Sequence, residues 1–285
     1  MWYDDRGTNT QAAEAGRSLH RPLNSESIRR VREGRAIVLF FAIAYSVSWS
    51  VWAILFKKGL SHLHGAGFYL YLLAVVAPHL SAVLVTALES GRTGITELYG
   101  RIFRRLSLRL LVAAIAAPVA IYFARYLLGA AFDQTFGASV FHPAPRSLSL
   151  LLIGQTAVAL GEEPGWRGFA LGRLTDRLGL VFGSVVLGIG WALWHLPLFI
   201  IAGTAQYGTP FLPFLTTLIA WSLIVTWFVR RARGAVIAAM LFHASANFCD
   251  FTMWESPSAL INVAPWLLAA AVATWRLQWE AHAAR

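Results

Sequence analysis

Three charged residues stand close together inside an otherwise apolar stretch of the sequence: Glu162, Glu163 and Arg167. Each charge costs about 3 kcal/mol at the centre of a membrane, so exposure of all three to lipid would cost about 9 kcal/mol. The three side chains must therefore pair, face the interior of a helical bundle or line a wet cavity, unless they mark the cytoplasmic end of a membrane-spanning segment.

Helix geometry separates the roles of the two glutamates. Glu163 and Arg167 lie four residues apart on one face, with the acid first, which favours an ion pair between them. Glu162 points about 100° away from Glu163, so we expect it to keep an unpaired carboxylate for other work. Pro164 and Gly165 are predicted to interrupt the helix and free backbone groups, which is tolerated only against protein or water.

A histidine, His195, lies in a second apolar stretch. Trp191 lies one helical turn earlier, and its ring could pack against the imidazole. Pro197 lacks an N–H group and is predicted to kink or end this helix. An imidazole can transfer protons near neutral pH, although a lone histidine on an apolar face is more often a packing residue than a catalytic one.

His243 and Asn247 lie four residues apart in a third apolar stretch. On a helix their side chains project from one face, about 6 Å apart. They could donate two hydrogen bonds to one oxygen atom, or bind a neighbouring helix, as polar side chains commonly do in membranes. The helical rise places Glu162 and His243 about 14 Å, and His195 about 20 Å, from the cytoplasmic surface. The three motifs are therefore predicted to converge in one layer.

Hydropathy predicts the elements that must position these residues. Of the 285 residues, 57% are hydrophobic and 13% are charged, against about 25% charged in an ordinary soluble domain. A stretch of about 20 apolar residues can span a bilayer. We expect an all-α, polytopic membrane protein with an intramembrane polar cavity and about eight transmembrane helices, at residues 36–56, 66–88, 110–132, 148–170, 179–201, 212–230, 234–254 and 258–275.

The basic residues predict the orientation, because Lys and Arg are enriched in cytoplasmic loops. Twenty arginines lie on one side of the predicted spans, and the other side holds Lys57, Lys58 and Arg146. We therefore predict a multi-pass cell-membrane protein with both termini in the cytoplasm. Its parts would be an N-terminal arm (1–35), a transmembrane domain (36–275) and a tail (276–285).

The net charge of +10 does not require a nucleic-acid partner. Arginines beside the spans can contact anionic lipid headgroups of the bilayer. The single cysteine, Cys249, excludes a disulfide framework, a Cys-rich zinc site and an iron–sulfur cluster. The sequence also lacks a glycine-rich phosphate loop, an HExxH motif and a serine nucleophile elbow.

The three polar motifs together resemble the CAAX prenyl protease and bacteriocin-processing family, also called the CPBP or Abi family. Glu162 to Arg167 resembles its EExxxR motif, and His243 to Asn247 its HxxxN motif. Trp191 to His195 resembles its aromatic-xxx-His motif, with Trp where Phe is commoner. Residues 77–82 are also similar to the family's second-helix pattern, and the resemblance covers about residues 70–250.

The resemblance implies an intramembrane glutamic endopeptidase that works without a cofactor or metal ion. Glu162 would be the general base, with His195 helping to orient and deprotonate a water molecule. His243 and Asn247 would hold the oxyanion of the tetrahedral intermediate. The substrate would be a peptide or membrane protein, with or without an attached lipid; the eukaryotic branch acts on prenylated C-terminal tails. The residues implied to support the site are Glu163, Arg167 and Trp191.

Two other functions remain open on the same residues. Glu162, His195 and His243 could bind zinc in a metalloprotease of the same architecture, since three N or O ligands and an open position are adequate. Asn247 and the second glutamate have no natural place in such a site. Intramembrane Glu and His residues also form proton relays, so a proton-coupled transporter or channel is the other alternative, although the sequence shows no internal repeat.

Overall fold

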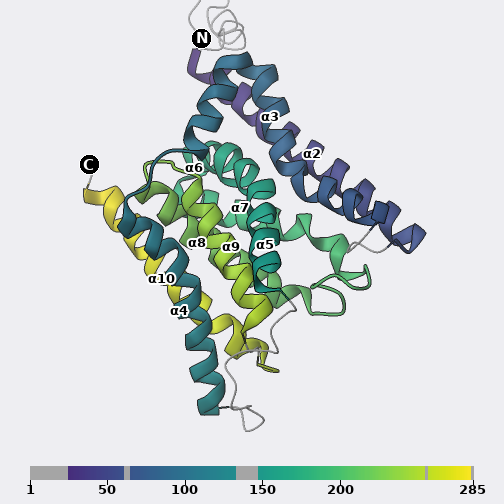
Figure 1. The fold of residues 1–285 in the computed structure, drawn as a ribbon. Helices are drawn as coiled ribbons and strands as arrows, with labels where there is room; N and C mark the ends of the chain where they lie inside the picture. The colour runs from purple at the N-terminus through teal and green to yellow at the C-terminus, as the bar shows by residue number, and fades with distance from the viewer. Residues whose placement is uncertain (1–24, 61–64, 133–146, 254–255, 284–285) are drawn as a thin grey trace, which may run out of the picture. The chain divides into compact units, whose positions relative to one another are not determined.

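The computed structural model describes residues 25–60, 65–132, 147–253 and 256–283, and every regular element in them is helical (Figure 1). In chain order these are α2 (Ser25–Lys58), α3 (Gly65–Ile102), α4 (Leu108–Phe132), α5 (Leu148–Glu163), the π-helical η1 (Pro164–Ala170), α6 (Leu171–Leu178), α7 (Leu180–Trp194), the 3₁₀-helical η2 (Leu196–Phe199), α8 (Phe211–Arg231), α9 (Ile237–Thr252) and α10 (Ala259–Ala283).

Each predicted span coincides with a helix, so the expected all-α, polytopic membrane architecture is confirmed. The helix ends differ from the predictions. The first helix begins at Ser25 rather than at residue 36, and α3 continues past residue 88 through a kink at Gly91. Five helices in the described ranges are long and apolar enough to cross a membrane by themselves: α2, α3, α4, α8 and α10.

The three predicted motifs lie on the shorter helices. α5 and α9 have 16 residues each and α7 has 15. A helix of 16 residues rises about 24 Å, less than the roughly 30 Å of a hydrocarbon core. The long helices can therefore bridge the bilayer by themselves, whereas α7 and α9 are too short to do so, and α5 is extended by η1 and α6.

Pro164 and Gly165 do not break the helix, which corrects the sequence-based expectation. α5 continues through η1 into α6 without leaving helical geometry, and Pro164 has a helical φ of −58°. The backbone accommodates the proline by widening into a π-helical turn. Such turns inside α-helices often occur at functional sites, and this one carries Arg167.

Two glycines allow α5 and η1 to approach α3 closely. A Cβ atom on Gly165 would lie 2.5 Å from the carbonyl oxygen of Pro78, and one on Gly161 would lie 3.3 Å from that of Val75. Small residues four apart let two membrane helices pack backbone to backbone. This packing holds the intervening glutamates against α3 at a fixed depth.

The chain divides into two compact units, Met1–Ala36 and Ile37–Arg285. Every predicted site residue belongs to the second unit. Within that unit α7 packs on α8, α8 on α10, and α9 on both α4 and α5 (Figure 1). The helices that carry the motifs thus have neighbours on several sides.

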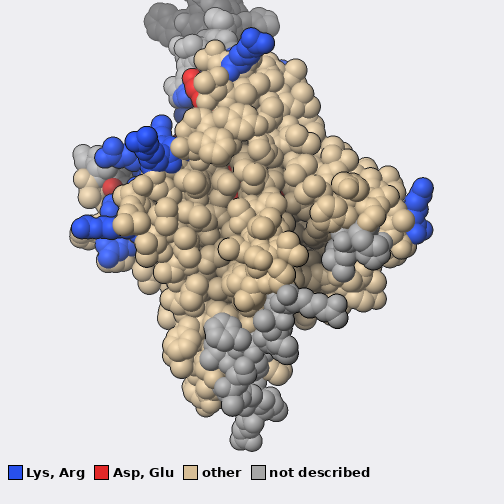
Figure 2. All heavy atoms as spheres, in the orientation of Figure 1, with Lys and Arg blue, Asp and Glu red and all other residues tan. Residues whose placement is uncertain are grey.

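Many large apolar side chains lie on the outside of the helices, among them Leu88, Leu150 and Leu260. Figure 2 shows a face that is mostly uncharged, with Lys and Arg gathered at its margins. Exposure of these apolar side chains to water would be unfavourable, whereas the acyl chains of lipids can surround them. The distribution of side chains is that of a protein surrounded by lipid.

Candidate active site

The ion pair predicted between Glu163 and Arg167 is confirmed, and it is buried. Arg167 Nη1 donates to Glu163 Oε1 at 2.8 Å, and each side chain is only 1% exposed. His243 of α9 binds the same oxygen through Nδ1 at 2.7 Å. An ionised carboxylate only accepts, so Nδ1 carries the hydrogen. Glu163 therefore also joins α9 to α5, a contact that helix geometry alone did not predict.

Glu162 is buried and is held by α7. Its Oε2 accepts a hydrogen bond from Trp191 Nε1 at 2.7 Å, and the residue is 2% exposed. As expected, Glu162 stays outside the ion pair of Glu163 and Arg167, but its carboxylate has a hydrogen-bond donor that the sequence did not predict. An indole can only donate, so the bond leaves Glu162 Oε1 and the negative charge available.

His195 caps the C-terminus of α7, where the chain turns into η2, as Pro197 predicted. Its Nδ1 lies 2.8 Å from the carbonyl oxygen of Trp191. A carbonyl only accepts, so Nδ1 carries the hydrogen and Nε2 of the neutral ring keeps a lone pair. The ring packs edge to face on Trp191 at 5.9 Å, as expected, and on Trp194 and Phe214. Nε2 of His195 can therefore accept a hydrogen bond.

Trp191 is the centre of the cluster. Its ring lies 5.2 Å from the His243 ring, and the guanidinium carbon of Arg167 lies 4.1 Å from its centroid. Arg167 Nε and Nη2 have no hydrogen-bond partner in the described part of the chain, so the indole face provides their stabilisation through a cation–π contact. A Phe at this position would lack the N–H group that binds Glu162.

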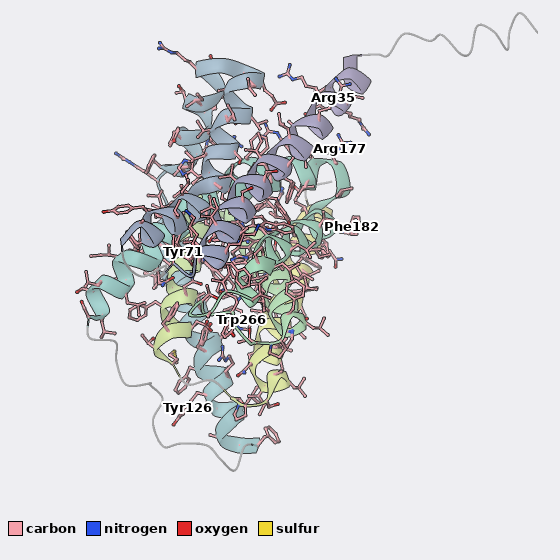
Figure 3. The ribbon with its side chains drawn as sticks, turned by 90° about the vertical axis from the view of Figure 1, so that its right-hand side faces the viewer. Arg35, Tyr71, Tyr126, Arg177, Phe182 and Trp266 are labelled. Atoms are coloured by element: carbon pink, nitrogen blue, oxygen red, sulfur yellow. The ribbon has the colours of Figure 1, made fainter. Side chains whose placement is uncertain are left out.

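Aromatic residues from two further helices close the cluster. Trp221 of α8 contacts the rings of both Trp191 and His243, each at 6.0 Å. Trp266 of α10 packs against Trp221 at 5.2 Å and is 1% exposed. Figure 3 shows Trp266 among densely packed side chains of the helical bundle. These rings lower the local polarity, which strengthens electrostatic interactions inside the site.

Asn247 lies one turn after His243 on α9 and reaches α5 by a separate contact. Its Nδ2 donates to Gln155 Oε1 at 3.0 Å. Sequence reasoning missed Gln155. The available signal was its spacing: Gln155 lies seven residues before Glu162, and helical geometry places residues at that spacing on nearly the same face.

The structure thus gathers most of the predicted site residues and leaves one at the edge. Asn247 shares α9 with His243, and its side chain binds Gln155 of α5 rather than a charged group. Among the described residues, no group of three His, Cys, Asp or Glu side chains could hold a metal ion. The residues in the central cluster are Glu162, Glu163, Arg167, Trp191, His195 and His243.

Other polar residues noted in the sequence lie elsewhere. Asp250, at the end of α9, accepts a hydrogen bond from the Tyr122 hydroxyl at 2.6 Å and pairs with Arg125 at 3.8 Å. This pair gives the charge inside α4 a partner on α9. His62 and His64 lie outside the described residues.

Fold and site together define an all-helical membrane protein in which a buried acid–imidazole cluster joins α5, α7 and α9. Residues 144–249 match the family described as Type II CAAX prenyl endopeptidase Rce1-like. This segment contains the EExxxR, aromatic-xxx-His and HxxxN patterns. The resemblance inferred from those motifs is therefore confirmed.

Two curated proteins are similar to this chain. The CAAX prenyl protease 2 of Methanococcus maripaludis is 35% identical over 106 residues, which cover 35% of this chain and 38% of that protein. The Lysostaphin resistance protein A of Staphylococcus haemolyticus is 25% identical over 188 residues, covering 63% of this chain and 48% of that protein. The chain spans less than half the length of these relatives.

Proposed function

We propose that this chain is an intramembrane endopeptidase that hydrolyses a peptide bond with a water molecule activated by Glu162 and His195. The strongest support is the convergence of a buried carboxylate and two imidazoles from three separate helices, connected through Trp191. Burial of so many polar groups inside a membrane protein is costly. A chemical role accounts for that cost better than packing does.

Glu162 and His195 would act together in the first step, the attack of water on the peptide bond. Glu162 Oε1 and His195 Nε2 are the acceptor atoms left by the two hydrogen bonds to Trp191. A water molecule held by these atoms loses a proton to them as its oxygen attacks the scissile carbonyl carbon. The tetrahedral intermediate then collapses: the C–N bond breaks, and the proton passes to the leaving nitrogen. The second proton of the water then passes from the new carboxyl group to the amine, so the products are a carboxylate and an ammonium group.

His243 and Asn247 would stabilise the negative oxygen of the intermediate. Because His243 Nδ1 already donates to Glu163, Nε2 can donate to an oxyanion only when the ring is an imidazolium. The buried Glu163 carboxylate stabilises that cation, and Arg167 fixes the carboxylate in turn. Preorganised donors of this kind are worth roughly 3 kcal/mol each in transition-state stabilisation.

The proposed substrate is a peptide with a prenylated cysteine near its C-terminus. The family description and the name of the archaeal relative both refer to a prenyl protease or endopeptidase. We further propose that both termini face the cytoplasm, because nineteen arginines, apart from the buried Arg167, lie on that side of the predicted spans. The site would then receive water and the peptide from the cytoplasm.

The proposed function predicts cleavage of a defined probe. Purified protein in lipid vesicles should hydrolyse an internally quenched C-a-a-X peptide whose cysteine carries a farnesyl group, with release of the residues after that cysteine. Fluorescence and mass spectrometry of the products measure this. A matched peptide without the farnesyl group tests whether the lipid is recognised. Absence of cleavage of both peptides would contradict the proposed function.

A second prediction concerns metal dependence. Since the proposed base and oxyanion donors are all side chains, the cleavage rate should stay unchanged after incubation with 1,10-phenanthroline. The non-chelating 1,7-phenanthroline isomer serves as the control for nonspecific effects. Loss of activity with the chelating isomer, restored by added Zn²⁺, would instead favour the metalloprotease alternative built on Glu162, His195 and His243.

A further inference from the structure

Two side-chain contacts connect α5 to α9 at different levels. Glu163 binds His243 at 2.7 Å, and Gln155 binds Asn247 at 3.0 Å. Asn247 follows His243 on α9, whereas its partner Gln155 precedes Glu163 on α5. The two helices therefore run antiparallel. The first contact joins a carboxylate to an imidazole and is fully buried, whereas the second joins two neutral amides and is half-buried.

The amide–amide contact determines which atom Asn247 can offer to a ligand. A primary amide has two N–H bonds and one carbonyl oxygen. One N–H of Asn247 is donated to Gln155 Oε1, which leaves the second N–H on the same nitrogen. Rotation of the amide by 180° would break this bond and exchange the nitrogen with the carbonyl oxygen. An oxygen turned toward a negatively charged intermediate would repel it.

We infer that Gln155 is a positioning residue: by accepting a hydrogen bond from Asn247, it keeps the Asn247 amide nitrogen oriented toward the oxyanion. This inference rests on the proposed function, because it assigns a role to a neighbour of the proposed oxyanion donor. Gln155 itself need not touch the substrate. Its contribution is the orientation of Asn247, which α9 alone does not determine because the terminal amide torsion is broad.

The test is a double-mutant cycle on cleavage of the farnesylated peptide in vesicles. Gln155→Met keeps the length of the side chain and removes the acceptor. It should lower kcat by about tenfold to a hundredfold, less than the 10²–10³-fold loss typical of removing an oxyanion donor outright, while KM stays within about twofold. Asn247→Ala should lower kcat further. The double variant should match Asn247→Ala, because Gln155 acts only through that residue.

Thr156→Val is the matched control. Thr156 is the next residue of α5, is exposed, and donates only within its own helix, to the Leu152 carbonyl at 2.8 Å. This variant should keep wild-type kcat. Thermal unfolding of all four variants checks that kcat differences do not follow stability.

The possible outcomes separate the two levels of inference. If Asn247→Ala loses activity but Gln155→Met does not, or if the two losses multiply in the double variant, the positioning role of Gln155 is wrong and the proposed function stands. If Asn247→Ala keeps full activity, the oxyanion assignment is wrong and the role of Gln155 falls with it. A wild-type protein that cleaves neither peptide overturns both.

Discussion

Replacement of Glu162 by glutamine is expected to abolish peptide cleavage while the protein remains inserted and folded. Glutamine has nearly the same shape, and its carbonyl oxygen can still accept the Trp191 N–H bond that holds α5 to α7. Its amide is not a useful base at neutral pH. A positioned general base contributes about 10²–10⁴-fold to rate, so kcat on the farnesylated peptide should fall at least a hundredfold.

The matched control for this variant is Glu97→Gln, which makes the same chemical change at an exposed position of α3. It should keep wild-type kcat. The unfolding temperatures of both variants should stay near that of the wild type, because neither change leaves a cavity. Wild-type turnover by Glu162→Gln would refute the assignment of the base. A variant that unfolds would show that the carboxylate is needed for the structure.

The second large effect is expected from Arg167→Ala, which should destabilise the fold as well as stop cleavage. Arg167 is buried, pairs with Glu163 at 2.8 Å and lies over the Trp191 ring. Its removal leaves the buried carboxylate with His243 as the remaining partner. Breaking a buried ion pair on one side typically costs about 3–5 kcal/mol. The loss should appear as a large decrease in the unfolding temperature in vesicles.

Arg173→Ala is the matched control for Arg167→Ala. Arg173 lies in α6, pairs with Glu89 at 2.9 Å and lies over the Phe169 ring, but its side chain is 24% exposed. Partial exposure to solvent weakens such a pair, so this variant should lose much less stability. A further variant, Glu163→Gln combined with Arg167→Met, removes both charges and should recover part of the stability but none of the activity. Equal stability of Arg167→Ala and the wild type would contradict the role of the pair.

The helices and the polar motifs could be predicted from local patterns. Uncharged stretches near 20 residues predicted the helices, and the i, i+4 spacing of Glu163 and Arg167 predicted their ion pair. The continuous helix through Pro164 was not predicted. Sequence rules treat proline as a local interruption, whereas close packing on α3 at Gly165 holds this segment in a π-helical turn.

The partners of the site residues could not be read from spacing within one helix. The Trp191 bond to Glu162 and the Gln155 bond to Asn247 each join residues from two different helices. The sequence marked Trp191 as a packing partner of His195 and as a supporting residue, but not as a hydrogen-bond donor to Glu162, and the spacing of Gln155 did not show its partner. Contacts between helices depend on their relative rotation and direction, which no pattern along a single helix contains.

The amino-acid sequence by itself determined that the chain is an all-helical membrane protein and which side chains are too polar to face lipid. These properties follow from hydropathy and helical periodicity, which are local. Only the tertiary structure decided that Glu163, besides pairing with Arg167, also binds His243, and which nitrogen of each histidine carries the hydrogen. The physical reason is that a buried donor or acceptor takes its state from its nearest partner, and these partners come from separate helices.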